Sequence, residues 1–149
     1  CEEYDRLALE MLRRKKEGKG INFFHFMLDL GQGPCAIKRL RGCGCGNEYA
    51  AIDPDGNVFP CHQFVGKPEW KMGSVLTKEY DTEQKARFAR ANVYSKDQCR
   101  SCWAKFYCSG GCNANNQEYE GDILKAHTLS CERLECAIMI KAALADAAG

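Results

Sequence analysis

The beginning of the chain has a helical pattern of apolar side chains. Tyr4, Leu7, Ala8, Met11 and Leu12 recur at intervals of three and four residues. This spacing places them on one face of a helix, which we predict over residues 2–16. The run of basic residues at 13–16 would then lie at the negative end of the helix dipole. Two glycines, at positions 18 and 20, are expected to end the helix.

Two later segments show the shorter, denser apolar pattern of strands. The run 21–30 is rich in aromatic residues and is predicted to be a buried strand, ended by the sequence GQGP at 31–34. Residues 47–53 and 57–60 are predicted to pair as a hairpin. The turn DPDG at 53–56 favours this, because proline presets φ and glycine accepts a positive φ. The hairpin brings Cys61 to its far end.

The second half of the chain is mostly helical in pattern. We expect a helix over 82–93, turns or short helical pieces over 99–112, and a final aliphatic helix over 131–147, capped by Ser130. Together these elements predict an α+β fold, with a small antiparallel hairpin and several helices.

Length and charge narrow the classes of function. The 149 residues suffice for one modest domain with a core. The net charge of +1 argues against nucleic-acid binding, which needs a clustered basic surface. No apolar run is long enough to span a membrane and no signal peptide is visible, so we expect a cytoplasmic protein without membrane contact. Because the chain begins at Cys1, we also expect it to be part of a longer protein.

The eleven cysteines need a chemical explanation. They could form a disulfide scaffold, zinc sites or iron–sulfur clusters. An odd number of cysteines, the chain length and the lack of a secretory signal disfavour disulfides. The choice between zinc and iron–sulfur therefore depends on the spacing of the cysteines.

The densest group of cysteines has the pattern Cys99-x2-Cys102-x5-Cys108-x3-Cys112, followed later by Cys131. A structural zinc site usually pairs two Cys-x2-Cys knuckles about 12–20 residues apart, which this short gap does not allow. Three close thiolates and one remote thiolate are better suited to a cubane cluster. In bacterial ferredoxins the last cysteine of such a run binds another cluster. By the same logic Cys112 would bind a different cluster, and Cys131 would be the fourth ligand of this one.

A second group lies nearer the N-terminus and consists of Cys43, Cys45 and Cys61, with Cys35 upstream. Gly56 stands five positions before Cys61, so the glycine turn is placed to direct that thiolate. This group is the candidate for another cluster, separate from the one that the dense group would bind.

The full pattern is Cys43-x12-Gly56-x4-Cys61, the dense group, and then Cys131, separated from Cys112 by eighteen residues. It resembles the seven-cysteine SPASM motif of radical S-adenosylmethionine enzymes, and the likeness spans residues 43–131. The segments GCGCGNEY at 42–49, VFPCHQFVG at 58–66 and FFHFM at 23–27 are similar to the SCIFF-peptide maturases, which install thioether links in ribosomally made peptides.

This resemblance implies two [4Fe–4S] clusters. The second auxiliary cluster would be held by Cys99, Cys102, Cys108 and Cys131, and the first by Cys43, Cys61 and Cys112. The fourth position of the first cluster would be filled by Cys35 or left open. Cys45 is an alternative to Cys43 if the register is shifted.

The resemblance also implies what this chain does not do alone. The Cys-x3-Cys-x2-Cys motif that binds the catalytic cluster of the family is absent, so no catalytic residue is assigned. S-adenosylmethionine and a third cluster would belong to an N-terminal catalytic domain outside this sequence. Residues 1–34 would be the end of that barrel or a connector, and residues 35–149 the SPASM domain. The implied partners are a cysteine-rich precursor peptide and a protein that donates or accepts electrons.

Two alternatives from other classes remain open at this stage. One is a free-standing two-cluster electron carrier of the ferredoxin type, which would leave the cluster-free N-terminal part unexplained. The other is a zinc-binding structural module. Metal analysis and an absorption band near about 400 nm, expected for ferric thiolate centres, distinguish the zinc module from the iron–sulfur proteins.

Overall fold

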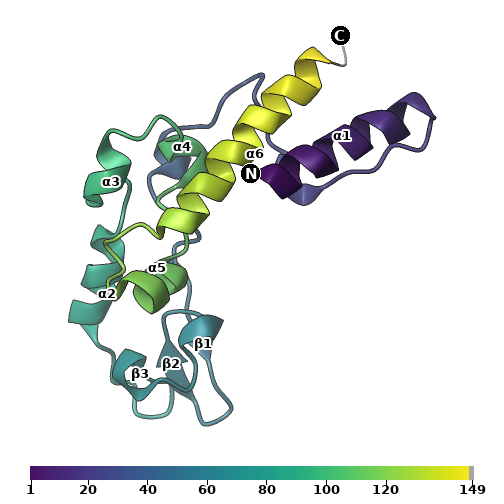
Figure 1. Cartoon of the computed structure of the whole chain (residues 1–149). Helices are drawn as coiled ribbons and strands as arrows, with labels where there is room; N and C mark the ends of the chain where they lie inside the picture. The colour runs from purple at the N-terminus through teal and green to yellow at the C-terminus, as the bar shows by residue number, and fades with distance from the viewer. Residues whose placement is uncertain (148–149) are drawn as a thin grey trace. The chain divides into compact units, whose positions relative to one another are not determined.

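The computed structural model describes residues 1–147. Within them the fold is α+β, as predicted, with six α-helices and a three-stranded antiparallel sheet (Figure 1). The described chain divides into two compact units. The helical unit consists of Cys1–Cys35 and the segment from Thr128 onward, and the cysteine-rich unit consists of Ala36–His127.

Two long helices form the framework of the helical unit: α1, Glu2–Lys16, and α6, Thr128–Asp146. They pack together through one apolar cluster, which also takes in Phe26. Its buried members are Ala8, Phe26, Cys136, Ala137 and Ile140, flanked by Tyr4, Leu7, Met11, Phe23, Leu28 and Leu144. The helix predicted over 2–16 is confirmed at both ends. No helix of the described chain is both long and apolar enough to cross a bilayer.

Two sequence-based predictions for this unit are wrong. Residues 21–30 do not form a strand but contain the 3-10 helix η1, Phe24–Phe26. Phe23 and Phe26 both meet the Tyr4 ring, with centroid distances of 5.8 and 5.3 Å. Side chains three residues apart therefore share a face, which a 3-10 turn allows and the alternation of a strand does not.

The second wrong prediction concerns the start of the last helix. Ser130 does not cap it, because α6 already begins at Thr128 and Ser130 lies inside the first turn.

The sheet of the cysteine-rich unit has the order β1-β2-β3, with β1 at Ala51–Ile52, β2 at Asn57–Phe59 and β3 at Gly73–Ser74. The predicted hairpin is confirmed, although its strands are shorter than expected and β3 was not predicted. Asp53 shapes the turn: its Oδ1 accepts hydrogen bonds from the backbone N–H of Asp55 at 3.0 Å and of Asn57 at 2.8 Å. Such a side-chain bond to the backbone is the usual reason for aspartate in turns.

The helices of this unit are short. They are α2, Thr82–Arg90; α3, Asp97–Arg100; α4, Lys105–Cys108; and α5, Asn113–Glu120. Three 3-10 turns precede them in the chain: η2, Ile37–Arg39; η3, His62–Phe64; and η4, Pro68–Trp70. Asp81 caps α2 by accepting a bond from Gln84 N at 2.8 Å. The helix ends at Arg90 rather than near Val93. The polar sequence of α5 gave no apolar period from which to predict it.

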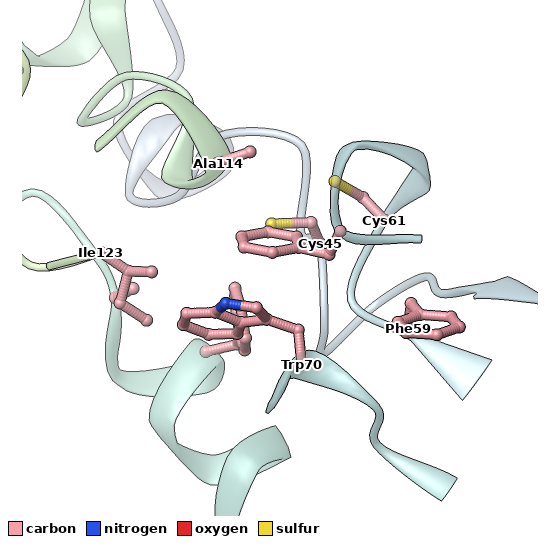
Figure 2. Close-up of a cluster of buried hydrophobic side chains, with 9 residues drawn as sticks. Cys45, Phe59, Cys61, Trp70, Ala114 and Ile123 are labelled. Atoms are coloured by element: carbon pink, nitrogen blue, oxygen red, sulfur yellow. The ribbon is translucent and has the colours of Figure 1, made fainter. Parts of the chain in front are cut away.

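An aromatic cluster forms the core of the cysteine-rich unit (Figure 2). The Phe64 ring lies 4.6 Å from the Trp70 ring and 5.7 Å from the Phe88 ring, centroid to centroid. Figure 2 shows Cys45 and Cys61 within this cluster, with Phe59 toward the strands and Ile123 on the opposite side. Two of the candidate ligands are thus built into the core itself.

Candidate metal centres

A loop of alternating glycine and cysteine positions the first group of thiols. Gly44 and Gly46 have φ of +74° and +72°, which a side chain would disfavour. The N–H of Gly46 donates to the carbonyl oxygens of Tyr49 at 3.0 Å and Pro60 at 2.9 Å. The second bond ties the loop to the end of β2, directly before Cys61. As a result Cys45 and Cys61 are both 3% exposed, whereas Cys43 is exposed.

The thiols of this group act on one another electrostatically. A hydrogen bond from Cys45 lowers the pKa of Cys43 to about 5. The same bond, burial and the negative charge that Cys43 and Cys61 would carry raise the pKa of Cys45. Burial followed by the charge of Cys43 and Cys61 raises the pKa of Tyr49. The charges of these three thiols therefore act on one another.

The beginning of α5 brings Cys112 to the same place. The Asn113 amide nitrogen Nδ2 lies 3.7 Å from Cys45 Sγ, in donor geometry. Gln63 Nε2, on the turn after Cys61, donates to Cys112 Sγ at 3.5 Å. The structure therefore brings Cys43, Cys45, Cys61 and Cys112 into one neighbourhood. The choice between Cys43 and Cys45 as ligand stays a prediction.

The second group of thiols is spread over two short helices and the turn between them. Cys99 is buried in α3, Cys102 follows it with its N–H bonded to Cys99 O at 3.2 Å, and Cys108 ends α4. Burial raises the pKa of Cys99, and the charges of Cys108 and Cys102 raise it further. These three sulfur atoms are thus also mutually coupled.

A run of left-handed residues follows Cys108. Ser109, Gly110 and Gly111 have φ of 59°, 82° and 74°. In this conformation successive N–H groups can point to one side and bind an anion. Burial raises the pKa of Cys108, while hydrogen bonds from the N–H groups of Gly111 and Gly110 lower it. Gly110 and Gly111 therefore present their N–H groups to the Cys108 sulfur.

The remaining cysteines belong to the helical unit. Cys131 is partly buried in the first turn of α6, and Cys35 is exposed at the end of the N-terminal segment. Their roles as fourth ligands stay predictions. Cys136 is buried in the apolar cluster of that unit, and Cys1 is exposed, in keeping with their place outside the motif.

Sequence reasoning missed the polar residues around the thiols. Asn113 touches Cys45, Gln63 touches Cys112, and the buried Lys96 bonds to Asn113 and to Gly110, which comes between Cys108 and Cys112. The only available signal was adjacency, because Asn113 follows Cys112 and Lys96 precedes Cys99 by three positions. Asparagine, glutamine and lysine are usually solvent-exposed, so adjacency alone did not single them out.

The chemistry of these residues fits iron–sulfur clusters. Soft thiolates are the ligands that such clusters prefer, and both groups offer sulfur with N–H donors beside it. Within residues 1–147, no three His, Cys, Asp or Glu side chains are arranged to bind a single metal ion. A cubane is ligated at separate iron atoms, so its thiolates need not converge on one point.

Comparison with known families gives an independent result. Residues 43–103 match the model of the SPASM family, an iron–sulfur cluster-binding domain. The matched segment contains Cys43, Cys45, Cys61, Cys99 and Cys102, which are members of both groups of thiols. It also contains the hairpin, the glycine–cysteine loop and most of the aromatic core. This part of the chain therefore resembles a SPASM domain, a type of domain that binds iron–sulfur clusters.

Proposed function

We propose that the SPASM domain of this chain holds the two auxiliary [4Fe–4S] clusters of a radical S-adenosylmethionine enzyme that installs thioether crosslinks in a ribosomally synthesised peptide. The division of thiols into two coupled groups within one compact unit carries this proposal. The family match supports cluster binding, and the resemblance of the cysteine-rich loop to the SCIFF maturases supports the reaction class.

Each group of thiols would hold one cluster. Cys43, Cys61 and Cys112 would bind the first cluster, with Cys45 as the alternative to Cys43. Cys99, Cys102, Cys108 and Cys131 would bind the second. In this arrangement residues 35–149 form the auxiliary domain, and residues 1–34 come from the end of the catalytic barrel or a connector.

The side chains around the first group prepare it for thiolate chemistry. Cys45 and Cys61 are held in a core that excludes water, in which charge interactions are stronger than in solution. Gln63 Nε2 donates a hydrogen bond to the Cys112 sulfur and so fixes its position next to the turn that follows Cys61. When bound, the clusters would supply an iron that binds and deprotonates a substrate thiol, and a site that accepts one electron.

The overall reaction balances with these parts. A deoxyadenosyl radical, made elsewhere in the enzyme, removes one hydrogen atom from a carbon of the peptide. A cysteine of the peptide loses its thiol proton, its sulfur bonds to that carbon, and one electron leaves to the auxiliary clusters. The peptide therefore loses two hydrogen atoms for each crosslink formed. A cytoplasmic location and an electron-transfer partner protein belong to the same proposal.

The first cluster would keep one iron available for substrate. The motif supplies seven cysteines, whereas two fully ligated cubanes need about eight thiolates. Cys35 is the competing fourth ligand. In the reconstituted protein, Cys35→Ala should leave the paramagnetic signal of this cluster intact, and a cysteine-containing substrate peptide should perturb it. Loss of the cluster in the variant, with no response of the native signal to peptide, would make Cys35 the fourth ligand.

The reaction class is tested with the complete enzyme and its peptide. Under anaerobic reducing conditions with S-adenosylmethionine, the peptide should lose two hydrogen atoms and one alkylatable thiol for each crosslink. Clusters that assemble and transfer electrons while the peptide stays unmodified would favour a ferredoxin-like carrier. Zinc in place of iron, with no absorption near about 400 nm, would favour a structural zinc module.

A further inference from the structure

Lys96 is the most unusual residue of the cysteine-rich unit. Its side chain is 1% exposed, although lysine is almost never fully buried without a charged partner. It immediately precedes α3, so its backbone is fixed next to Cys99, whose N–H donates to the Lys96 carbonyl oxygen at 2.9 Å. Because the backbone holds one end, the ammonium group at the other end has a defined position.

The ammonium group reaches the turn that joins the two groups of thiols. Lys96 Nζ donates to the carbonyl oxygen of Gly110 at 2.7 Å and to Asn113 Oδ1 at 3.0 Å. Gly110 comes between Cys108 and Cys112, and Asn113 follows Cys112. A Cβ on Gly110 would lie 3.4 Å from Lys96 Nζ, so a glycine there leaves room for this approach.

The charge of this group needs compensation. Burial lowers the pKa of Lys96, and two neutral acceptors do not offset the loss of hydration of a cation. The groups that act on it most strongly in the opposite direction are four cysteines: Cys99, Cys108, Cys45 and Cys112. Two belong to each group of thiols. The geometry agrees, because the ammonium group is bonded to Gly110, between Cys108 and Cys112, and to Asn113, next to Cys112.

We propose that Lys96 supplies one fixed positive charge shared by the two cluster sites, which raises the reduction potential of both clusters. This inference rests on the proposed cluster binding. Reduction adds one negative charge to a cluster, and a buried ammonium stabilises the more negative state most. Because its ammonium group is bonded to Gly110 O and Asn113 Oδ1, Lys96 would act on the clusters through its charge, as a positioning residue for electron transfer.

The test is a redox titration of the reconstituted chain, followed by the paramagnetic signals of the reduced clusters. Lys96→Met keeps the length of the side chain and removes the charge. We expect both clusters to become at least about tenfold harder to reduce, a shift of ~59 mV to more negative potential for a one-electron couple. Lys96→Arg keeps the positive charge, so both potentials should stay close to those of the unsubstituted chain. Lys125→Met, which removes a charge from an exposed position of the same unit, should leave both potentials in place.

Asn113→Asp offers a second route that leaves Lys96 in position. It adds a negative charge where Oδ1 now lies 3.0 Å from the ammonium, so both potentials should again fall. Asn115→Asp, on the same helix, is its control. If Lys96→Met does not load clusters, this pair of variants decides the outcome by the same measurement.

Several results would overturn the inference. Loaded clusters with unchanged potentials in Lys96→Met would show that the lysine has only a structural role. A shift in one cluster alone would show that the charge is not shared. A wild-type chain that takes up no iron would instead refute the proposed function, and the inference with it, so the two failures are distinguishable.

Discussion

The helical unit and the cysteine-rich unit differ in what stabilises their secondary structure. In the first, helices of 15 and 19 residues bury a shared apolar stripe. In the second, no helix exceeds 9 residues and no strand exceeds 3. Helices shorter than about 12–15 residues are marginal in water without tertiary support. The elements of the cysteine-rich unit therefore depend more on tertiary contacts. Seven of the eleven cysteines lie in this unit.

The comparison teaches where metal binding contributes to the fold. An apolar stripe along a long helix stabilises the helical unit without any cofactor. The cysteine-rich unit has a small aromatic core and a series of left-handed turns that carry thiols. Cluster binding would cross-link these turns, so its free energy would also be folding free energy.

Iron removal should produce the largest difference in stability between the two units. Structural metal sites contribute about 10 kcal/mol or more to small domains. After anaerobic chelation of the reconstituted chain, amide hydrogen exchange should rise sharply over residues 36–127 and little in α1. Equal loss of protection in both units would contradict the distinction. Unchanged protection everywhere would show that the clusters are not structural.

Replacing single cysteines sharpens the same distinction. Cys108→Ala removes a predicted ligand whose sulfur accepts two backbone N–H groups, and should remove one cluster, about half of the bound iron. Cys136→Ala removes a buried thiol from the apolar cluster of the helical unit. It should leave the iron content unchanged and cost about 1 kcal/mol of stability. Similar iron loss in both variants, measured by metal analysis, would show that the ligand assignment is wrong.

A pair of glycines tests how tightly each unit is packed. Gly46 and Gly18 have nearly the same φ, +72° and +71°. A Cβ on Gly46 would lie 2.5 Å from Phe88 Cγ, whereas a Cβ on Gly18 would meet nothing within 4 Å. Alanine at either position costs about 1–2 kcal/mol for the left-handed backbone, and at Gly46 about 1–3 kcal/mol more for overpacking. In denaturant unfolding, the free energy of unfolding should be clearly lower for Gly46→Ala than for Gly18→Ala. Equal losses of stability in the two variants would argue against close packing of the loop on Phe88.

The smallest effect is expected at the turn of the hairpin. Hydrogen bonds from Asn57 lower the pKa of Asp53 below its ordinary value of about 3.9. A depressed pKa in the folded state means that this carboxylate stabilises the fold above the unfolded pKa. The contribution is lost as the pH falls through the folded pKa. The Asp53 side-chain resonances should therefore titrate below the ordinary value for an aspartate, as followed by NMR; a midpoint at or above that value would refute the turn geometry.

The sequence predicted regular elements where a period or a turn signal existed. The apolar period and the glycines that follow it predicted both ends of α1 correctly, and the turn at 53–56 predicted the place of the hairpin. Residues 21–30 were misassigned because an aromatic run has no period, and packing on Tyr4 selected a 3-10 turn. The strand β3 has only two residues, Gly73 and Ser74, too few to leave a pattern.

The sequence singles out the cysteines of the candidate site and not their surroundings. Cysteine spacing predicts two groups of thiols, because a cluster constrains the spacing of the residues that hold it. The polar neighbours are set by the tertiary fold: Lys96 meets Gly110 fourteen positions later, and Asn113 meets Cys45 sixty-eight positions earlier. No local pattern encodes such contacts, so the shared positive charge between the two groups emerged only from the structure.

The most direct test of the central claim is the iron and acid-labile sulfide content of this chain after anaerobic reconstitution, measured with its absorption and paramagnetic spectra. The two groups of cysteines predict about eight iron and eight sulfide per chain, with signals from two [4Fe–4S] clusters. Stoichiometric zinc with no uptake of iron would contradict the account.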